Sequence, residues 1–168
     1  VEPIASIGYN ACLKKLQNQG WIIQEKAIKK GFNNTIRNTG LIGRWSTLQE
    51  NPKVICDTGH NEDGVKLIVQ QLKDEKYENL HIVWGMVNDK DVSKILKYLP
   101  KNAKYYWCSP EIERALTTKE LEASAFDLEL KGKTYSSVLK AKETAIRYGG
   151  KNDLVFIGGS TFVVAEAL

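Results

Sequence analysis

The sequence predicts an α/β fold: a Rossmann-like, mainly parallel sheet of about six strands with helices on both faces. Three observations support this prediction. From Trp45 onward, short apolar runs alternate with amphipathic segments of helical spacing. The apolar run Val54–Cys56 ends abruptly in the polar cluster Asp57–Asn61, and Leu154–Ile157 ends in the same way in Gly158–Thr161. Parallel neighbours need crossover connections, which the intervening helices supply.

The first part of the chain has a different pattern. Ile7–Leu16 and Ile22–Lys30 place apolar residues at helical spacing and predict two short helices. The polar stretch Asn33–Gly43 is typical of a linker or exposed loop. We therefore expect a boundary here, with residues 1–40 separate from a domain formed by residues 41–168.

The second part begins with a predicted hairpin. Trp45–Gln49 and Lys53–Asp57 are expected to be antiparallel strands on either side of an Asn51-Pro52 turn. Strands and helices then alternate to the end of the chain. We expect strands at Leu80–Gly85, Lys104–Cys108, Lys133–Tyr135 and Leu154–Ile157, and helices at Gly64–Leu72, Lys90–Leu99, Thr118–Ala125, Ser137–Tyr148 and from Thr161 onward.

Composition and charge indicate an ordinary globular chain. The 168 residues are 42% hydrophobic and 26% charged, and the net charge of +4 comes from lysines scattered in small groups. A scattered set favours solvated helix faces over a nucleic-acid surface, although a mild positive bias suits small anionic ligands. No apolar stretch approaches the roughly 20 residues of a membrane span.

The cysteines and histidines argue against a zinc site. The three cysteines have no CxxC spacing, and His60 and His81 are the only histidines. We therefore expect a reduced, cytoplasmic setting. The chain starts at Val1 without a methionine and ends at Leu168 inside a helix-like pattern, so we also expect it to be cut from a longer protein.

Two nucleotide-binding fingerprints are missing from the sequence. No G-x-G-x-x-G occurs, so dinucleotide binding in the usual manner is unsupported. Gly59–Lys66 has the glycine spacing of a P-loop, but Val65 precedes Lys66 and no Ser or Thr follows it. The chain therefore has no phosphate cradle of its own for an ATP-dependent reaction.

The polar cluster after the first apolar run lies where open α/β sheets build binding sites. Asp57 could accept ribose hydroxyls or orient a metal-bound water, or it could cap the following helix. His60 could contact a phosphate or carboxylate as an imidazolium, or be structural. Asn61 has the same ambiguity, because Asn is a favoured cap and turn residue.

Three further features are candidates for the same site. Gly159 and Ser160 open the last predicted helix, where backbone N–H groups and a hydroxyl could hold a carboxylate or phosphate, or form a plain N-cap. Arg44 offers a planar guanidinium to a phosphate, carboxylate or base, or it stacks on Trp45. Asn88–Asp91 is either a solvated loop or the rim of the site.

Five short motifs, taken together and in this order, resemble those of a known family, although no single motif is enough to show it. They are Gly43-Arg44, Asp57-Thr58-Gly59-His60-Asn61, Gly85-Met86-Val87-Asn88-Asp89-Lys90-Asp91, Arg114-Ala115-Leu116, and Asp153 through Gly159-Ser160. From about Asn10 to Leu168 the chain resembles the carboxy-terminal domain of folylpolyglutamate synthase, whose bifunctional form is also dihydrofolate synthase, within the Mur ligase family. Thr58-Gly59 stands where that family usually has Gly-Ala.

The resemblance implies an ATP-dependent ligase. In this family ATP phosphorylates the terminal carboxylate of a folate or dihydropteroate, the amine of L-glutamate attacks the acyl phosphate, and an amide forms with release of ADP and phosphate. The P-loop, the Mg²⁺ ligands and much of the folate pocket belong to an N-terminal ATPase domain of the same polypeptide. Residues 1–40 would be the last helices and linker of that domain, and residues 41–168 would close over the nucleotide and bring the glutamate.

The resemblance also implies roles for individual residues. Arg44 and Asp57 would bind the nucleotide, with Asp57 toward the ribose and Arg44 toward ribose or phosphate. His60 would be catalytic, near the phosphates and the incoming glutamate, and Ser160 would help to hold glutamate. Asn61 and Gly159 would support the loops, and no metal ligand is expected in this domain.

Two other functions remain open on the sequence. One is a Mur-type peptidoglycan or cyanophycin-type amino-acid ligase domain, although Gly85–Asp91 and Arg114–Leu116 favour the folate branch. The other is a non-catalytic Rossmann-like module that binds a small ligand alone. If the ligase interpretation is right, the isolated chain should fold but show no ligase turnover.

Overall fold

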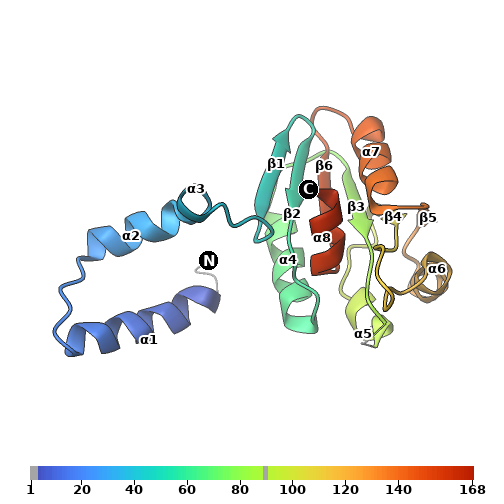
Figure 1. Ribbon diagram of the computed structural model, residues 1–168. Coiled ribbons are helices and arrows are strands. Elements are labelled where there is room, and N and C mark those ends of the chain that lie inside the picture. Colours follow the sequence, from blue (N-terminus) through green and yellow to red (C-terminus); the bar gives the residue numbers. More distant parts are fainter. Residues whose placement is uncertain (1–3, 89–90) are drawn as a thin grey trace. The chain divides into compact units, whose positions relative to one another are not determined.

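The computed structural model describes residues 4–88 and 91–168, with side chains described from residue 11 onward (Figure 1). The chain divides into two compact units, Val1–Ile42 and Gly43–Leu168. The described residues of the first unit form helices α1 (Ile4–Asn18), α2 (Glu25–Asn33) and α3 (Thr35–Thr39). Neither α2 nor α3 contains a buried residue.

Helix α3 corrects the prediction of a linker over residues 33–43. The Thr35 hydroxyl donates to the carbonyl oxygens of Gly31 and Phe32, at 3.1 and 2.9 Å, and the Thr39 hydroxyl donates to the Thr35 carbonyl at 2.7 Å. These side chains satisfy carbonyls within a short helical turn. Gly40, with φ of 66°, then ends the helix in the left-handed conformation that glycine tolerates.

The second unit is built on one sheet. Among the described residues its strands are β1 (Ser46–Glu50), β2 (Lys53–Cys56), β3 (Leu80–Trp84), β4 (Ala103–Trp107), β5 (Gly132–Thr134) and β6 (Leu154–Gly158), in the order β1-β2-β6-β3-β4-β5. The β1–β2 hairpin is antiparallel, and every other neighbouring pair is parallel. The predicted mainly parallel α/β sheet is therefore confirmed.

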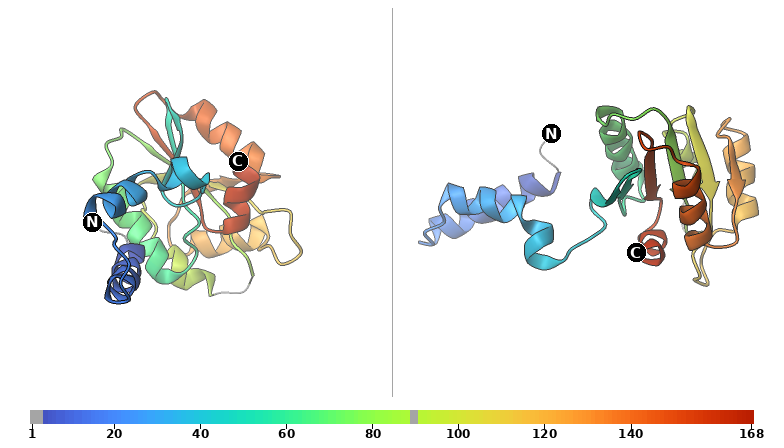
Figure 2. Two further views of the ribbon diagram at one scale, coloured as in Figure 1. Left: turned by 60° about the vertical axis from the view of Figure 1, so that its left-hand side comes forward. Right: turned by 90° about the horizontal axis from the view of Figure 1, so that it is seen from above.

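Helices cover both faces of this sheet. Helices α4 (Glu62–Asp74), α5 (Val92–Leu96) and α6 (Thr118–Phe126) pack into one hydrophobic core, and α7 (Val138–Tyr148) and α8 (Thr161–Ala167) pack into the other. Figure 2 shows α4 on one side of the strands and α7 and α8 on the other. Along β2, Ile55 enters the first core while Val54 and Cys56 enter the second, as the period of a strand requires.

Helix α5 is shorter than the predicted helix at residues 90–99, and Lys90 lies outside the described residues. The Asp91 carboxylate caps its start by accepting the Lys94 N–H at 3.4 Å. Beyond Leu96, the Tyr98 and Leu99 N–H groups bond three residues back, and Pro100 follows. The chain therefore tightens into turns before the proline, which disfavours a helix at the residue preceding it.

A buried polar network closes the amino-terminal edge of the sheet. Asp153 accepts the Asn79 backbone and side-chain N–H groups at 3.0 and 2.9 Å, the Gly150 N–H at 2.8 Å and His81 Nε2–H at 3.2 Å. The Tyr106 hydroxyl lies 2.8 Å from His81 Nδ1 and donates to it. Burial raises the pKa of Asp153, but these hydrogen bonds outweigh it and bring the pKa down to about 2.

Candidate functional site

The candidate residues come from loops that leave the carboxyl edge of the sheet. Strands β2, β6, β3 and β4 are successive neighbours and run parallel, so their carboxyl ends meet at this edge. Backbone bonds hold the first residues of the loops together, because the Asp57 N–H donates to Ile157 at 3.1 Å and the Gly85 N–H to Gly158 at 3.4 Å. The loops that follow β2, β6 and β3 are far apart in the sequence, but they therefore begin next to one another.

Asp57 joins two of these loops. One carboxylate oxygen accepts the Trp45 backbone N–H at 2.8 Å, and the other accepts the Gly59 N–H at 2.7 Å. The side chain does not cap α4, because Asn61 does so by accepting the Gly64 N–H at 2.8 Å. The helix-cap alternative for Asp57 is therefore wrong, and Asn61 is the cap.

The loop that contains Arg44 is fixed on both sides of that residue. The Thr58 N–H donates to the Gly43 carbonyl at 2.9 Å, and the Gly43 N–H donates to Ser46 Oγ at 3.1 Å. Gly43 has φ of 102° and Trp45 has φ of 43°, both in the left-handed region. Glycine adopts such a φ freely, whereas Trp45 does so at some cost, and Arg44 is exposed between them.

The Arg44 guanidinium makes no hydrogen bond or ion pair with any residue in the described ranges. It does not stack on Trp45, whose ring instead packs on Phe156 with centroids 5.9 Å apart. The stacking alternative for Arg44 is therefore wrong. The loop presents a solvated, planar cation beside Asp57.

His60 is exposed at the end of the next loop. Its Nδ1 lies 2.9 Å from the Thr58 carbonyl oxygen, which can only accept, so Nδ1 carries the proton. In the neutral ring the lone pair is then on Nε2, which can accept a proton or bind an anion once protonated. The local backbone thus sets the tautomer of this imidazole.

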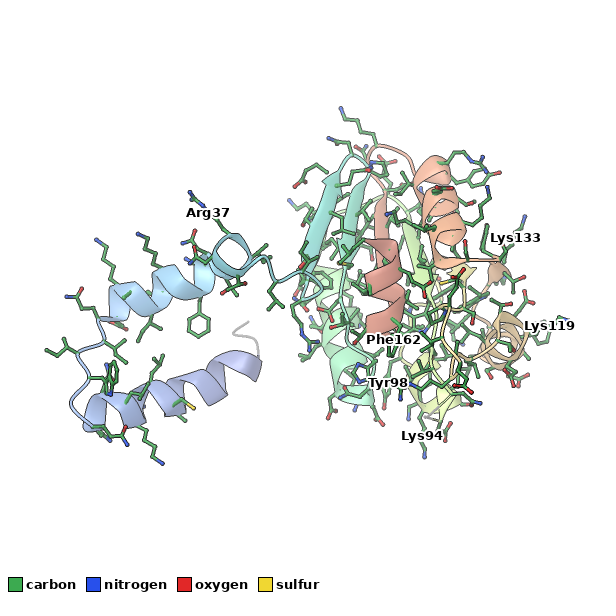
Figure 3. All side chains as sticks on the ribbon, viewed as in Figure 1. Arg37, Lys94, Tyr98, Lys119, Lys133 and Phe162 are labelled. Carbon is green, nitrogen blue, oxygen red and sulfur yellow. The ribbon has the colours of Figure 1, made fainter. Side chains whose placement is uncertain are left out.

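The helix that follows His60 begins in an ion-paired cluster. Glu62, in the first turn of α4, accepts the Tyr98 hydroxyl and pairs with Lys66 at 3.0 Å. The Tyr98 hydroxyl first, and Lys66 second, lower the pKa of Glu62 to about 2. Tyr98 and Phe162 lie at the same end of this unit in Figure 3.

Gly159 and Ser160 make the sharp turn between β6 and α8. Gly159 has φ of 93°, and a Cβ there would lie 2.5 Å from the Gly85 carbonyl oxygen, so no larger residue fits. Ser160 is 2% exposed, and its Oγ accepts the Phe162 N–H at 3.2 Å. Ser160 is thus an N-cap, and its hydroxyl proton remains available for an acceptor.

The structure adds Arg114 to this edge. Residues 86–88 pair antiparallel with residues 114–116, through Asn88 N–H to the Arg114 carbonyl at 2.8 Å and Leu116 N–H to the Met86 carbonyl at 2.9 Å. The Arg114 guanidinium lies 5.3 Å from the centroid of the ring of Phe162, whose N–H donates to Ser160 Oγ. From the sequence, Arg114 was noted only as part of a motif. Its position after β4 was a signal that it lies at the carboxyl edge of the sheet. Asp89 and Lys90 of the neighbouring motif lie outside the described residues.

In the described part of the chain, no three His, Cys, Asp or Glu side chains gather in a way that could hold a metal ion. No helix there is long and apolar enough to cross a membrane. Cys56 and Cys108 are buried, which raises their pKa to about 11 and about 12. These two thiols are therefore poor nucleophiles and metal ligands.

A mainly parallel sheet with polar loops gathered at its carboxyl edge is the architecture of an α/β ligand-binding domain. A family model described as "Mur ligase, glutamate ligase domain" matches residues 43–161. The chain belongs to this family. The match begins at Gly43, where the second compact unit also begins, and includes Arg44, Asp57, His60 and Ser160.

Two relatives of similar sequence both have folylpolyglutamate synthase in their names. The chain is 29% identical over 158 residues to the dihydrofolate synthase/folylpolyglutamate synthase of Escherichia coli, covering 93% of this chain and 36% of the relative. It is 32% identical over 148 residues to a "probable bifunctional folylpolyglutamate synthase/dihydropteroate synthase" of Haloferax volcanii, covering 86% and 17%. The chain thus spans only 17% to 36% of the length of these two curated relatives.

Solved structures show the same fold. The E. coli FolC protein in complex with ADP, without folate substrate, matches with a TM-score of 0.78 and 29% identity over 92% of this chain and 36% of that one. The same protein in complex with DHPP and ADP matches with a TM-score of 0.78 and the same identity and coverage. The likeness includes the sheet and the helices on both of its faces.

Proposed function

We propose that this chain is the C-terminal domain of an ATP-dependent folate:glutamate ligase. The proposal rests on one observation. Residues 43–161 match the model of a glutamate ligase domain family, and within this range Arg44, Asp57 and His60 lie at one edge of the sheet. The names of the relatives, and the ADP and DHPP in the E. coli structure titles, support folate and nucleotide as ligands. The reaction joins a folate or dihydropteroate carboxylate to the amine of L-glutamate through an acyl phosphate.

Each candidate side chain suits one part of that reaction. The exposed Arg44 guanidinium can steady phosphate charge, and Arg44 and Asp57 together form the nucleotide side of the site. His60 stands toward the transferred phosphate and the incoming amine, where an imidazole can stabilise charge or move a proton at Nε2. Ser160 donates its hydroxyl to the glutamate carboxylate, and Arg114 supplies a second cation nearby.

The rest of the machinery is assigned to an N-terminal ATPase domain of the same polypeptide. No metal-binding cluster occurs in the described residues of this chain, so they do not fit a Mg²⁺ site, and the P-loop fingerprint is missing as well. We place residues 1–40 with that domain. Exposed apolar side chains in this segment, including Trp21 at 65% and Ile22 at 95%, support a covering partner. The complete protein would act in the cytoplasm.

The test uses the complete protein. ATP-dependent incorporation of glutamate is measured with dihydropteroate and with tetrahydrofolate as separate acceptors, for wild type and for Ser160→Ala. Ser124→Ala, which removes a hydroxyl in the C-terminal half of α6, outside the candidate site residues, is the matched control. We expect incorporation with at least one acceptor, a loss of roughly tenfold or more in Ser160→Ala and none in the control. The isolated chain should show no turnover.

Three other outcomes would contradict different parts of the proposal. If the complete protein is folded and binds ATP but glutamylates neither acceptor, the folate assignment is wrong and a Mur-type or cyanophycin-type amino-acid ligase replaces it. Turnover by the isolated chain would contradict the assignment of the phosphate loop to another domain. Tight nucleotide binding by the isolated chain, without any ligase activity in the complete protein, would favour the non-catalytic module.

A further inference from the structure

Trp84 has the one buried side-chain nitrogen or oxygen atom that lacks a hydrogen-bond partner among the described residues, the indole Nε1. This residue is the last of β3 and is 0% exposed, so bulk water does not reach the N–H group. A buried donor that loses its bonds to water and gains none costs free energy, and nearly all such groups in folded proteins therefore have a partner. The Trp84 N–H thus needs an acceptor that no described residue provides.

The turn at Gly159 lies directly against this indole. A Cβ on Gly159 would be 2.7 Å from Trp84 Cε2, the ring carbon bonded to Nε1, and 2.5 Å from the carbonyl oxygen of Gly85. Gly85 is buried, and its carbonyl accepts no hydrogen bond from the described residues. A donor and an acceptor, each without a partner, therefore lie close to the same glycine without being bonded to each other.

The residue after this glycine also has an unused acceptor position. Ser160 is 2% exposed, and among the described residues its Oγ accepts only the Phe162 N–H. A hydroxyl oxygen has two lone pairs, so one of them is left over. One donor and two acceptors are the set that a single water molecule satisfies, because it accepts one hydrogen bond and donates two.

We propose that Trp84 Nε1–H, the Gly85 carbonyl and Ser160 Oγ bind one buried water molecule at the Gly159 turn, and that Trp84 is thereby a positioning residue for the Ser160 hydroxyl. Buried waters typically make about three hydrogen bonds to groups that have no other partner. Since the water donates to Ser160 Oγ, the hydroxyl proton of Ser160 stays free for a ligand. An oxygen that accepts two hydrogen bonds is also a stronger donor.

The first test needs no ligand. In the isotope-labelled chain, the indole proton of Trp84 is assigned by the loss of its signal in Trp84→Phe, and magnetisation transfer from water is measured in the rotating frame. A bound water gives a cross-peak of opposite sign to the diagonal, whereas hydrogen exchange with solvent gives the same sign. We expect the bound-water sign at Trp84 and the exchange sign at Trp21, which is 65% exposed. No cross-peak at Trp84, or the exchange sign alone, would overturn the hydration site.

The second test concerns the positioning role, which rests on the proposed function, in which Ser160 binds the glutamate carboxylate. In the complete protein the Trp84 indole is replaced by benzothiophene, which keeps both rings and has sulfur in place of the N–H. We expect the KM of glutamate to rise roughly tenfold, with kcat and the KM of ATP unchanged, because the Ser160 hydroxyl alone loses its support.

Trp107 provides the matched control for this replacement. It is buried and lies in register with Trp84 on the neighbouring strand β4, but its ring stacks on Tyr105, with centroids 4.5 Å apart. The same benzothiophene replacement there should leave all three kinetic constants unchanged. An unchanged glutamate KM in the Trp84 analogue, or an equal rise in the KM values of glutamate and ATP, would reject the positioning role.

The two tests also separate this inference from the proposed function. If the complete protein does not glutamylate a folate acceptor, the proposed function fails, and the water cross-peak at the Trp84 indole still decides whether the hydration site exists. If glutamylation occurs and the indole proton shows no bound water, the function stands and the inference is rejected.

Discussion

The two edges of the sheet each hold an aspartate, a histidine and an asparagine, in very different settings. At the amino edge, Asn79 and His81 both bond to Asp153, and His81 is 0% and Asp153 5% exposed. At the carboxyl edge, Asp57 and Asn61 accept backbone N–H groups, Nδ1 of His60 donates to a carbonyl, and His60 is exposed.

The difference shows what separates a structural polar set from a candidate site. At the amino edge the side chains satisfy one another and are far apart in sequence, so their bonds hold β3, β4 and β6 together. At the carboxyl edge they organise local loops and leave a guanidinium and an imidazole at the surface. The same residue types therefore stabilise the fold at one edge, and at the other edge they form the site that we propose for the ligands.

The largest stability effect is expected at the amino edge. Asp153→Ala leaves His81, Asn79 and the Gly150 N–H without their acceptor, and we expect the free energy of unfolding to fall by about 3 kcal/mol. Urea unfolding followed by tryptophan fluorescence measures this loss. Asp63→Ala, on the exposed surface of α4, is the control and should change stability by less than about 0.5 kcal/mol. Equal losses of unfolding free energy in Asp153→Ala and Asp63→Ala would contradict the structural role of the polar set at the amino edge.

At the carboxyl edge, the free energy of unfolding should depend on the turn at Gly159, between β6 and α8. Gly159→Ala forces a Cβ into a left-handed position 2.5 Å from the Gly85 carbonyl, so we expect a loss of about 2 kcal/mol. Gly150→Ala is the control, because its added Cβ would find its nearest atom at 3.4 Å, an ordinary contact. The same urea measurement applies, and a neutral Gly159→Ala would show that the turn is not rigid.

His81 should make the stability of the fold depend on pH in the acid range. Burial, followed by the nearby charge of Lys104, lowers the pKa of His81 against the opposing effect of Asp153. The unfolded chain then binds more protons than the folded one, so stability is present above the ordinary pKa of about 6.5 and is lost as pH falls through the lower folded value.

Unfolding free energies measured between about pH 8 and about pH 5 test this sign. The wild type should lose stability toward acid, and His81→Gln should flatten that dependence. A slope that survives His81→Gln would mean that another group controls acid stability.

The smallest effect is expected from removing residues 1–42. Every described residue of the two cores comes from the second unit, so residues 43–168 alone should keep their free energy of unfolding within about 0.5 kcal/mol. Urea unfolding of the shortened and full chains provides the comparison. Failure of residues 43–168 to fold would contradict the boundary.

The sequence predicted the sheet well because strand periodicity is strong there. Val54–Cys56 and Leu154–Ile157 are apolar runs flanked by turn residues, and both are parallel neighbours in the sheet. The hairpin around Asn51-Pro52 was also confirmed. Helix α3 was missed because its threonines are poor helix formers whose hydroxyls bond back to the chain, which composition does not reveal.

The sequence places the candidate residues at one edge of the sheet, but it does not predict their contacts. Strand order places Asp57, Ser160 and Gly85 at one edge, and alternation of strands and helices is enough to expect that. The bonds from Asp57 to Trp45 and Gly59, and the pairing of residues 86–88 with 114–116, depend on backbone dihedrals. No local sequence signal specifies them. The His81 network escaped notice for a related reason, since its members lie far apart in the chain.

The most direct test of the account is the rate of ATP-dependent glutamate incorporation by the complete protein carrying His60→Ala, compared with wild type under conditions where both are folded. The proposed catalytic role of His60 predicts a rate lower by roughly a hundredfold, with an unchanged free energy of unfolding because the side chain is exposed. A folded His60→Ala protein that incorporates glutamate at the wild-type rate would contradict the claim that the carboxyl edge is the catalytic one.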